Sequence, residues 1–175
     1  GWASRDVTTD APINIPGQFH MRVSRGVMDP VTVTALAIDN GEDCVIFLSA
    51  DLVVIRSGLL DEIRLATIQK NPKIPTEKIL MNATHTHAGP SHDAESAREN
   101  AKSGISTPAV GQVPHEGIEI ASSDAYRHFL ADQASDAVCE AWEKRVAGGI
   151  SYGYGYAVVA HSRRVVYFDD TSLRP

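Results

Sequence analysis

The sequence predicts an α/β fold, built on a mixed and partly parallel sheet with flanking helices, in a single domain spanning residues 1–175. Three patterns predict it: a hairpin signal in residues 31–51, a strand, helix and strand in succession across residues 44–83, and an amphipathic helix over residues 123–144. A chain of 175 residues is long enough to bury a core of its own.

The hairpin signal has two strands and a turn. Residues 31–39 (VTVTALAID) are rich in β-branched and apolar residues, as strands are. Asn40-Gly41 is a strong turn signal for a hairpin. Residues 42–51 supply the second strand, and their apolar run at 45–48 lacks alternation, which is typical of a strand covered on both faces.

A crossover unit follows the hairpin. Residues 57–70 carry apolar or small side chains at helical spacing, namely Leu59, Leu60, Ile63, Ala66 and Thr67. Pro72 and Pro75 end this helix, and residues 79–83 form a short strand. Because a strand, a helix and a strand in this order make a crossover, the two strands are expected to pair in parallel.

The remaining segments are less uniform. Residues 1–30 read as irregular, and residues 88–122 form a long loop rich in Gly and Pro, which in a compact domain is functional or disordered. A helix is predicted over residues 123–144 with Ser123 as N-cap. Its expected buried stripe comprises Phe129, Leu130, Ala134, Ala137, Val138, Ala141 and Trp142. Alternating tyrosines predict a further strand at residues 150–160.

Composition excludes some classes of function. The formal net charge is −6, which argues against binding to nucleic acid, whose phosphates attract a basic surface. No apolar run approaches the roughly 20 residues of a membrane helix. Cys44 and Cys139 are interpreted as two buried free thiols, and because neither lies in a C-x-x-C pair, a structural zinc site of thiolates is not expected.

The motif that carries chemistry is residues 82–90 (NATHTHAGP), which directly follows a predicted strand. In extended backbone, residues two apart point to the same side, roughly 6–7 Å apart. His85 and His87 can therefore converge on one metal ion, or one can bind metal while the other faces a substrate. Thr84 and Thr86 then point the other way. Open α/β sheets place their sites beyond the carboxyl ends of strands, where this motif falls.

An isolated H-x-H pair often binds no metal, so the residues around it decide whether a metal site is expected. The strand end before it and the sharp Gly89-Pro90 turn after it, which leaves room above the imidazoles, favour a metal site. Metallo-β-lactamase-type hydrolases carry H-x-H-x-D-H. Here Gly89 and Pro90 occupy the positions of the aspartate and the last histidine, so this motif does not match. Amidohydrolase barrels also use H-x-H, but this chain is too short for eight strand–helix units.

Five segments resemble, in order along nearly the whole chain, the N-terminal catalytic region of the neutral ceramidase family of zinc-dependent amide hydrolases. They are Asp6–Thr9, Pro16–Phe19, Ser49–Leu52, Thr84–Pro90 and Tyr156–Arg164. The T-H-T-H-A-G-P element is the specific one and matches without a gap. The others are individually weak, with Thr9 in place of a proline and Ser162 in place of an asparagine.

This resemblance implies a function and roles for three residues. His85 matches the histidine that ligates the catalytic zinc. His87 matches the second motif histidine, which contacts substrate or orders the zinc-bound water, and Arg163 matches a site arginine. The implied reaction is hydrolysis of a ceramide-like lipid amide, N-acylsphingosine, to a sphingoid base and a fatty acid. A secreted or cell-envelope location and contact with a membrane surface follow from the same resemblance.

Family enzymes complete the zinc site with another histidine, a glutamate and a tyrosine from segments that have no match here. The chain is therefore interpreted as the N-terminal part of a longer ceramidase-like catalytic domain, incomplete as an enzyme by itself. The alternative is a noncatalytic binding or interaction domain that keeps the fold but lacks a complete metal site.

Other polar residues receive simpler interpretations. Asp51 ends a buried strand and is a candidate for a site role, as a supporting carboxylate that orients a histidine. His92, His115 and His128 are expected to be solvated. His161 stands two residues before Arg163 and is a candidate supporting group for it.

Overall fold

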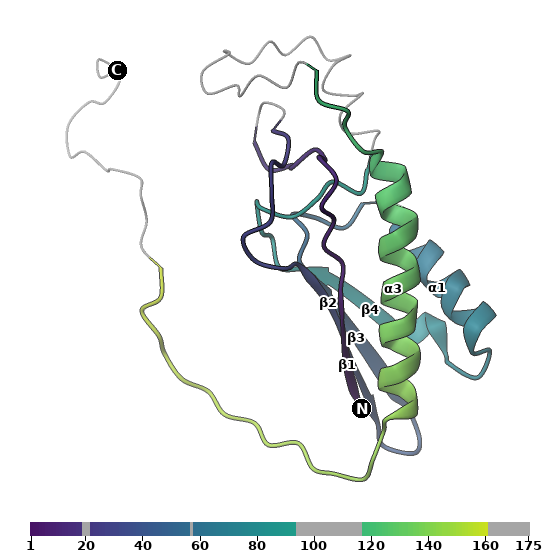
Figure 1. Cartoon of the computed structure of the whole chain (residues 1–175). Coiled ribbons are helices and arrows are strands. Elements are labelled where there is room, and N and C mark those ends of the chain that lie inside the picture. Colours follow the sequence, from purple (N-terminus) through teal and green to yellow (C-terminus); the bar gives the residue numbers. More distant parts are fainter. Residues whose placement is uncertain (19–21, 57, 94–116, 161–175) are drawn as a thin grey trace, which may run out of the picture.

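The structure is a computed structural model that describes residues 1–18, 22–56, 58–93 and 117–160 (Figure 1). One four-stranded sheet of order β1-β2-β3-β4 carries both long helices on the same side. The elements in chain order are β1 (Trp2–Asp6), β2 (Thr32–Asp39), β3 (Cys44–Ala50), α1 (Leu59–Lys70), the 3-10 turn η1 (Thr76–Lys78), β4 (Ile79–Ala83) and α3 (Ser123–Glu143). The predicted α/β class is confirmed.

Strand pairing follows the predicted hairpin and crossover. β2 and β3 pair antiparallel, and β3 and β4 pair in parallel through α1. In the hairpin turn the Asn40 side chain accepts hydrogen bonds from the amides of Glu42 and Asp43, and Gly41 takes φ 87°. The expectation that residues 1–30 are wholly irregular is wrong at their start, since β1 pairs antiparallel with β2.

Helix α3 packs on β1 and β2 through small side chains. The sheet contributes Ala3, Ala35 and Ala37, and the helix contributes Ala134, Ala137 and Ala141, all buried. Alanine on both sides brings the helix backbone close to the sheet. Most of the predicted stripe is buried, but Phe129 is 40% exposed and Tyr126 is buried in its place. The N-cap is Ser122, not Ser123, because its Oγ accepts from the Ala125 amide.

Among the described residues, no helix lies on the opposite face of the sheet. One exposed side chain from each strand meets the next in register across this face, and together they form what we call the apolar row: Trp2, Leu36, Phe47 and Leu80. The next row toward the strand ends is polar: Ser4 Oγ lies 2.9 Å from Thr34 Oγ1, and Asn82 Nδ2 donates to Ser49 Oγ at 3.1 Å. Polarity on this face therefore rises toward the carboxyl ends of β3 and β4.

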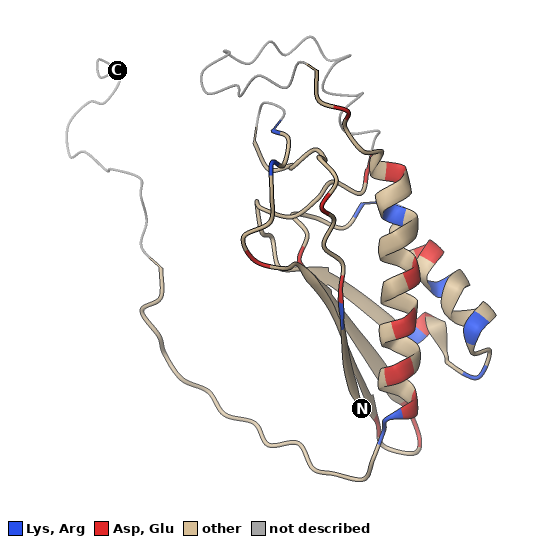
Figure 2. Cartoon of the chain, viewed as in Figure 1, with Lys and Arg blue, Asp and Glu red and all other residues tan. Residues whose placement is uncertain are grey.

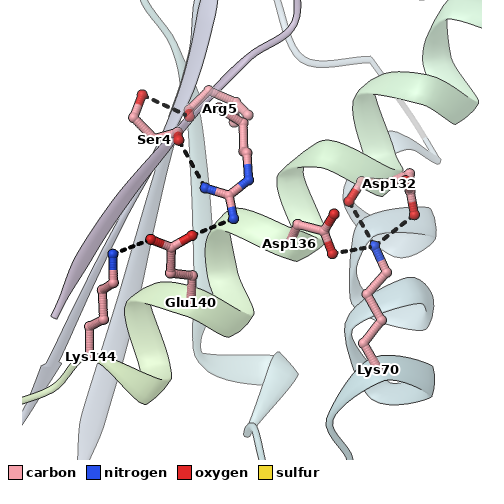
Figure 3. Close-up of polar contacts among 8 residues, drawn as sticks. Ser4, Arg5, Lys70, Asp132, Asp136, Glu140 and Lys144 are labelled. Carbon is pink, nitrogen blue, oxygen red and sulfur yellow. Dashed lines mark hydrogen bonds and ion pairs between the residues drawn. The ribbon is translucent and has the colours of Figure 1, made fainter.

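Charged side chains join the helices to their neighbours. Acidic residues recur along α3 (Figure 2), where Glu140 pairs with Arg5 of β1, and Lys70 of α1 contacts Asp132 at 2.6 Å and Asp136 at 2.8 Å (Figure 3). These side chains are partly exposed, so each pair contributes little to stability. Within the described ranges no helix is both long and apolar enough to cross a membrane.

The strand predicted at residues 150–160 is absent. This segment runs extended and unpaired beyond α3 (Figure 1), and Tyr152, Tyr154 and Tyr156 are 76–94% exposed. The alternation that suggests a strand is one of tyrosine with glycine, and glycine weakens a strand because it has no side chain to pack and loses the most backbone entropy.

Candidate metal centre

The histidine motif lies where the two parallel strands end. β3 ends at Ala50 and β4 at Ala83, and the Thr84 amide donates to the Ala50 carbonyl at 3.0 Å. Parallel strands bring their carboxyl ends to the same edge of a sheet, which is the usual place for a site in an α/β fold. The residues that follow β3 and β4 therefore face one another across a short gap.

Asp51, the residue after β3, holds three strand ends together. Its carboxylate accepts hydrogen bonds from the Thr32 amide at 2.8 Å, from Thr32 Oγ1 at 3.0 Å and from Thr84 Oγ1 at 3.1 Å. Asp51 does not orient His85, because Nδ1 of that histidine bonds to the Val53 carbonyl and the hydrogen bonds of the Asp51 carboxylate come from Thr32 and Thr84. Its role here is to fix the backbone immediately before His85.

His85 has a strained backbone and a fixed ring. Its φ is 63°, the one positive value among the described residues that are not glycine. A non-glycine residue in this region costs of order 1–3 kcal/mol, and such strain gathers at functional sites. Nδ1 lies 2.6 Å from the Val53 carbonyl oxygen, which can only accept. The ring proton is therefore on Nδ1, and Nε2 keeps a free lone pair in the neutral ring.

The two motif histidines converge. The Nε2 atoms of His85 and His87 are 3.4 Å apart, and the rings meet edge to face with centroids 4.9 Å apart. Two imidazoles on one tetrahedral zinc, with Zn–N bonds of about 2.0–2.1 Å, would hold their nitrogens about 3.3–3.4 Å apart. The rings meet through the bend at His85 and not through the extended backbone that simple alternation assumes. Both are exposed and thus accessible to an ion.

Two residues from the N-terminal segment, outside the motif, contact His87. Arg22 Nη2 donates to the His87 carbonyl at 2.6 Å, and Gly17 lies directly against the His87 ring. A side-chain carbon added at Gly17 would lie 2.5 Å from His87 Nδ1. In the sequence, Gly17 stands out only as part of a weak glycine–aromatic element, and no pattern singles out Arg22.

A cavity of about 550 Å³ lies behind the motif. Thr86, Ala88 and Pro90 line it, so alternate residues of the loop face the histidine side and the cavity side. The N-terminal segment supplies apolar wall residues, namely Ile13, Ile15, Val27, Met28 and Val31. It also supplies charged ones, namely Arg22, Arg25 and Asp29. Gly89 is buried, and an added Cβ would lie 2.4 Å from the Asp51 carbonyl oxygen, so a residue without a side chain is needed for this close approach.

The other polar residues considered in the sequence separate into three cases. His92 was expected to be solvated, but it is 3% exposed and its Nε2 accepts from the Arg56 amide at 3.2 Å. Burial lowers the pKa of His92. His128 is exposed and pairs with Glu62. Arg163, His115 and His161 lie outside the described residues. The two cysteines are free and half-buried.

The donor set fits part of a zinc site. Catalytic zinc sites use about three protein ligands and keep one position open. His85 and His87 offer two nitrogens at a suitable separation. In the described part of the chain, no group of three or more His, Cys, Asp or Glu side chains is placed to hold a metal ion. Further ligands would have to come from elsewhere.

Comparison with known proteins finds the fold among solved structures. No protein-family model matches the sequence, and no curated protein matches it. The structure is similar to the neutral ceramidase from Pseudomonas aeruginosa, with TM-score 0.59 and 17% identity, over 83% of this chain and 21% of that one. A ceramidase complexed with C2 matches with TM-score 0.59 and 18% identity, over 82% and 20%. The chain thus has the fold of part of a ceramidase and spans about a fifth of those proteins.

Proposed function

We propose that this chain carries part of the active site of a zinc-dependent hydrolase of N-acyl amides, and that it forms the N-terminal part of a longer catalytic domain. The observation that carries the proposal is the His85–His87 pair, with its Nε2 atoms 3.4 Å apart at the ends of two parallel strands. The fold shared with solved ceramidases supports the same function.

We assign His85 as the zinc ligand. Its Nδ1 donates to the Val53 carbonyl, which leaves Nε2 free to bind. A hydrogen bond to the far nitrogen of a ligating histidine fixes the tautomer and raises the basicity of the ligand. The zinc ion, when bound, would supply Lewis-acid activation of a water molecule and of an amide carbonyl.

His87 and Arg163 are proposed as the substrate-facing residues. His87 Nε2 lies beside His85 Nε2 on an exposed surface, where it can donate to or accept from a substrate. The assignment of Arg163 rests on the sequence resemblance alone. As hydrogen-bond donors, both would stabilise the oxyanion that forms as the amide is attacked. The proposed substrate class is a ceramide-like lipid amide.

Metal binding by this chain tests the site directly. We expect zinc, measured by isothermal titration, to bind at about one ion per chain, and weakly, because the described residues offer His85 as a ligand and at most one further nitrogen, Nε2 of His87. His85→Ala should abolish this binding, since losing one of so few ligands is rarely tolerated. The matched control is His128→Ala, which removes an exposed histidine of α3. Equal zinc binding by His85→Ala and the unaltered chain would refute the assignment.

Hydrolysis of a fluorescent ceramide tests the activity. The 175-residue chain should release little or no fatty acid, and a longer form that includes the segments following it should be active and chelator-sensitive. In that form His87→Ala and Arg163→Ala should each lower kcat by roughly 100-fold. Robust chelator-sensitive turnover by the short chain would show that its site is already complete.

A noncatalytic binding domain is the second candidate, and the observation that favours it is the two-nitrogen donor set. This candidate predicts that a longer form of the chain neither hydrolyses ceramide nor binds zinc through His85. The two experiments above therefore separate the candidates.

A further inference from the structure

Two short stretches near the N-terminus are built against the histidine loop. Residues 13–15 and 22–24 face each other in a small antiparallel ladder, with Ile15 N donating to the Arg22 carbonyl at 2.8 Å and Ser24 N donating to the Ile13 carbonyl at 2.9 Å. The Ser91 amide donates to the Asn14 carbonyl at 2.8 Å, which ties this ladder to the end of the loop. Backbone hydrogen bonds therefore join the ladder to the loop that carries the histidines.

Arg22 extends from this ladder to the backbone of His87. Its Nη2 donates to the His87 carbonyl at 2.6 Å and to the Pro16 carbonyl at 3.0 Å, so one guanidinium nitrogen bridges the loop and the N-terminal segment. A charge-assisted hydrogen bond of this kind is stronger than a neutral one. The carbonyl of His87 is thereby held where the chain bends toward Gly89.

Gly17 fixes the ring of the same residue. Its φ is 98°, a conformation that favours glycine, and an added Cβ would lie 2.5 Å from His87 Nδ1 and 2.7 Å from Cγ. The backbone of Gly17 thus approaches the imidazole so closely that a side chain at this position would displace the ring. His85 has the Val53 carbonyl to orient its ring; His87 has a steric wall.

We propose that Arg22 and Gly17 are positioning residues for His87: Arg22 sets its backbone and Gly17 its ring, so that Nε2 is held beside that of His85. An exposed histidine would otherwise sample several rotamers. The effect on catalysis rests on the proposed function, whereas the positioning of His87 is independent of it.

The first test is NMR of the metal-free chain at fixed pH. In the unaltered chain we expect cross-relaxation between Gly17 Hα and the His87 ring, and between the rings of His85 and His87. Gly17→Ala and Arg22→Gln should remove both signals. Gly41→Ala is the matched control for glycine, since Gly41 has φ 87° but nothing within 4 Å of an added Cβ. Lys73→Gln, which removes an exposed cation from the turn after α1, is the control for Arg22.

Arg22→Lys keeps a cation that can reach one carbonyl and should retain part of the signal, which provides a milder variant if Arg22→Gln does not fold by circular dichroism. Unchanged ring-to-ring signals in folded Gly17→Ala and in both Arg22 variants would overturn the proposal.

The second test uses the longer, active form. Gly17→Ala and Arg22→Gln should each lower kcat by about 10–100-fold, the range found for partners that orient site residues, with KM changed less than about twofold. Arg22→Lys should recover part of the loss, and the two controls should leave kcat unchanged. An equal loss in Gly41→Ala would show that general strain, not positioning, causes the effect. If the longer form neither binds zinc nor hydrolyses ceramide while the NMR result holds, the proposed function fails and the positioning role stands.

Discussion

Removal of the Asp51 carboxylate should loosen three strand ends at once. In Asp51→Ala, the Thr32 amide, the Thr32 hydroxyl and the Thr84 hydroxyl all lose their acceptor. A net contribution of about 0.5–1.5 kcal/mol per hydrogen bond gives, for three bonds, a loss of about 1.5–4.5 kcal/mol in the free energy of unfolding. Asp51 is half-buried, so water satisfies some of the freed donors, which favours the lower part of this range.

Asp51→Asn separates hydrogen bonding from charge. Its side-chain oxygen can still accept from both Thr32 donors, which bind the same carboxylate oxygen, and its amide can donate to Thr84 Oγ1 after that hydroxyl rotates. The loss should therefore stay below about 1 kcal/mol. Asp10→Ala, at an exposed aspartate, is the control and should change stability by less than about 0.5 kcal/mol.

Urea unfolding followed by circular dichroism measures these differences. With a slope of about 2 kcal/mol/M, the middle of the usual range, the Asp51→Ala midpoint should fall by roughly 1–2 M. Because Thr84 precedes His85, zinc binding should weaken as well in Asp51→Ala and persist in Asp51→Asn. An unfolding free energy for Asp51→Ala within about 0.5 kcal/mol of the unaltered chain would refute the idea that this carboxylate holds the strand ends.

Two further predictions concern stability. Burial lowers the pKa of His92 below its ordinary value of 6.5; Asp93 opposes this shift, and Arg127 and Arg56 reinforce it. As the pH falls through about 6.5, the unfolded state takes up a proton first, so the free energy of unfolding declines. Urea unfolding at pH 7.5 and 5.5 should show a smaller decline in His92→Gln than in the unaltered chain, and equal declines would contradict this. Replacing Tyr152, Tyr154 and Tyr156 together by Ser should change the free energy of unfolding by less than about 0.5 kcal/mol, because these side chains are 76–94% exposed; a larger loss would mean that the segment packs on the domain.

Elements with strong local signals could be predicted from the sequence. The Asn40-Gly41 turn fixes the hairpin, and the proline-bounded helix before β4 fixes the crossover, so both pairings follow from neighbouring residues. β1 could not be predicted in this way, because its five residues alternate only weakly and their partner strand lies about 30 positions later. Residues 150–160 show the opposite error: the period of a strand is present, but no neighbour pairs with it.

Of the candidate site, only the two histidines at its centre could be predicted from the sequence. The H-x-H motif identified His85 and His87, but three features that shape them come from distant segments or from backbone geometry. The left-handed turn at His85, the Val53 carbonyl and the Arg22 contact leave no local trace in the sequence. The burial of His92 was missed for the same reason, since a polar side chain is buried only when a partner such as the Arg56 amide satisfies it.

The apolar row, on the sheet face where the described residues place no helix, has a consequence for handling the protein. Trp2, Leu36, Phe47 and Leu80 make a continuous apolar surface across all four strands, and contiguous surfaces of this kind bind other apolar surfaces. A solution of this chain should therefore brighten an apolar-surface dye, associate more as its concentration rises, and become monodisperse in mild detergent. Trp2 lies at the edge of the row and is 60% exposed, so its fluorescence should change when this surface is covered.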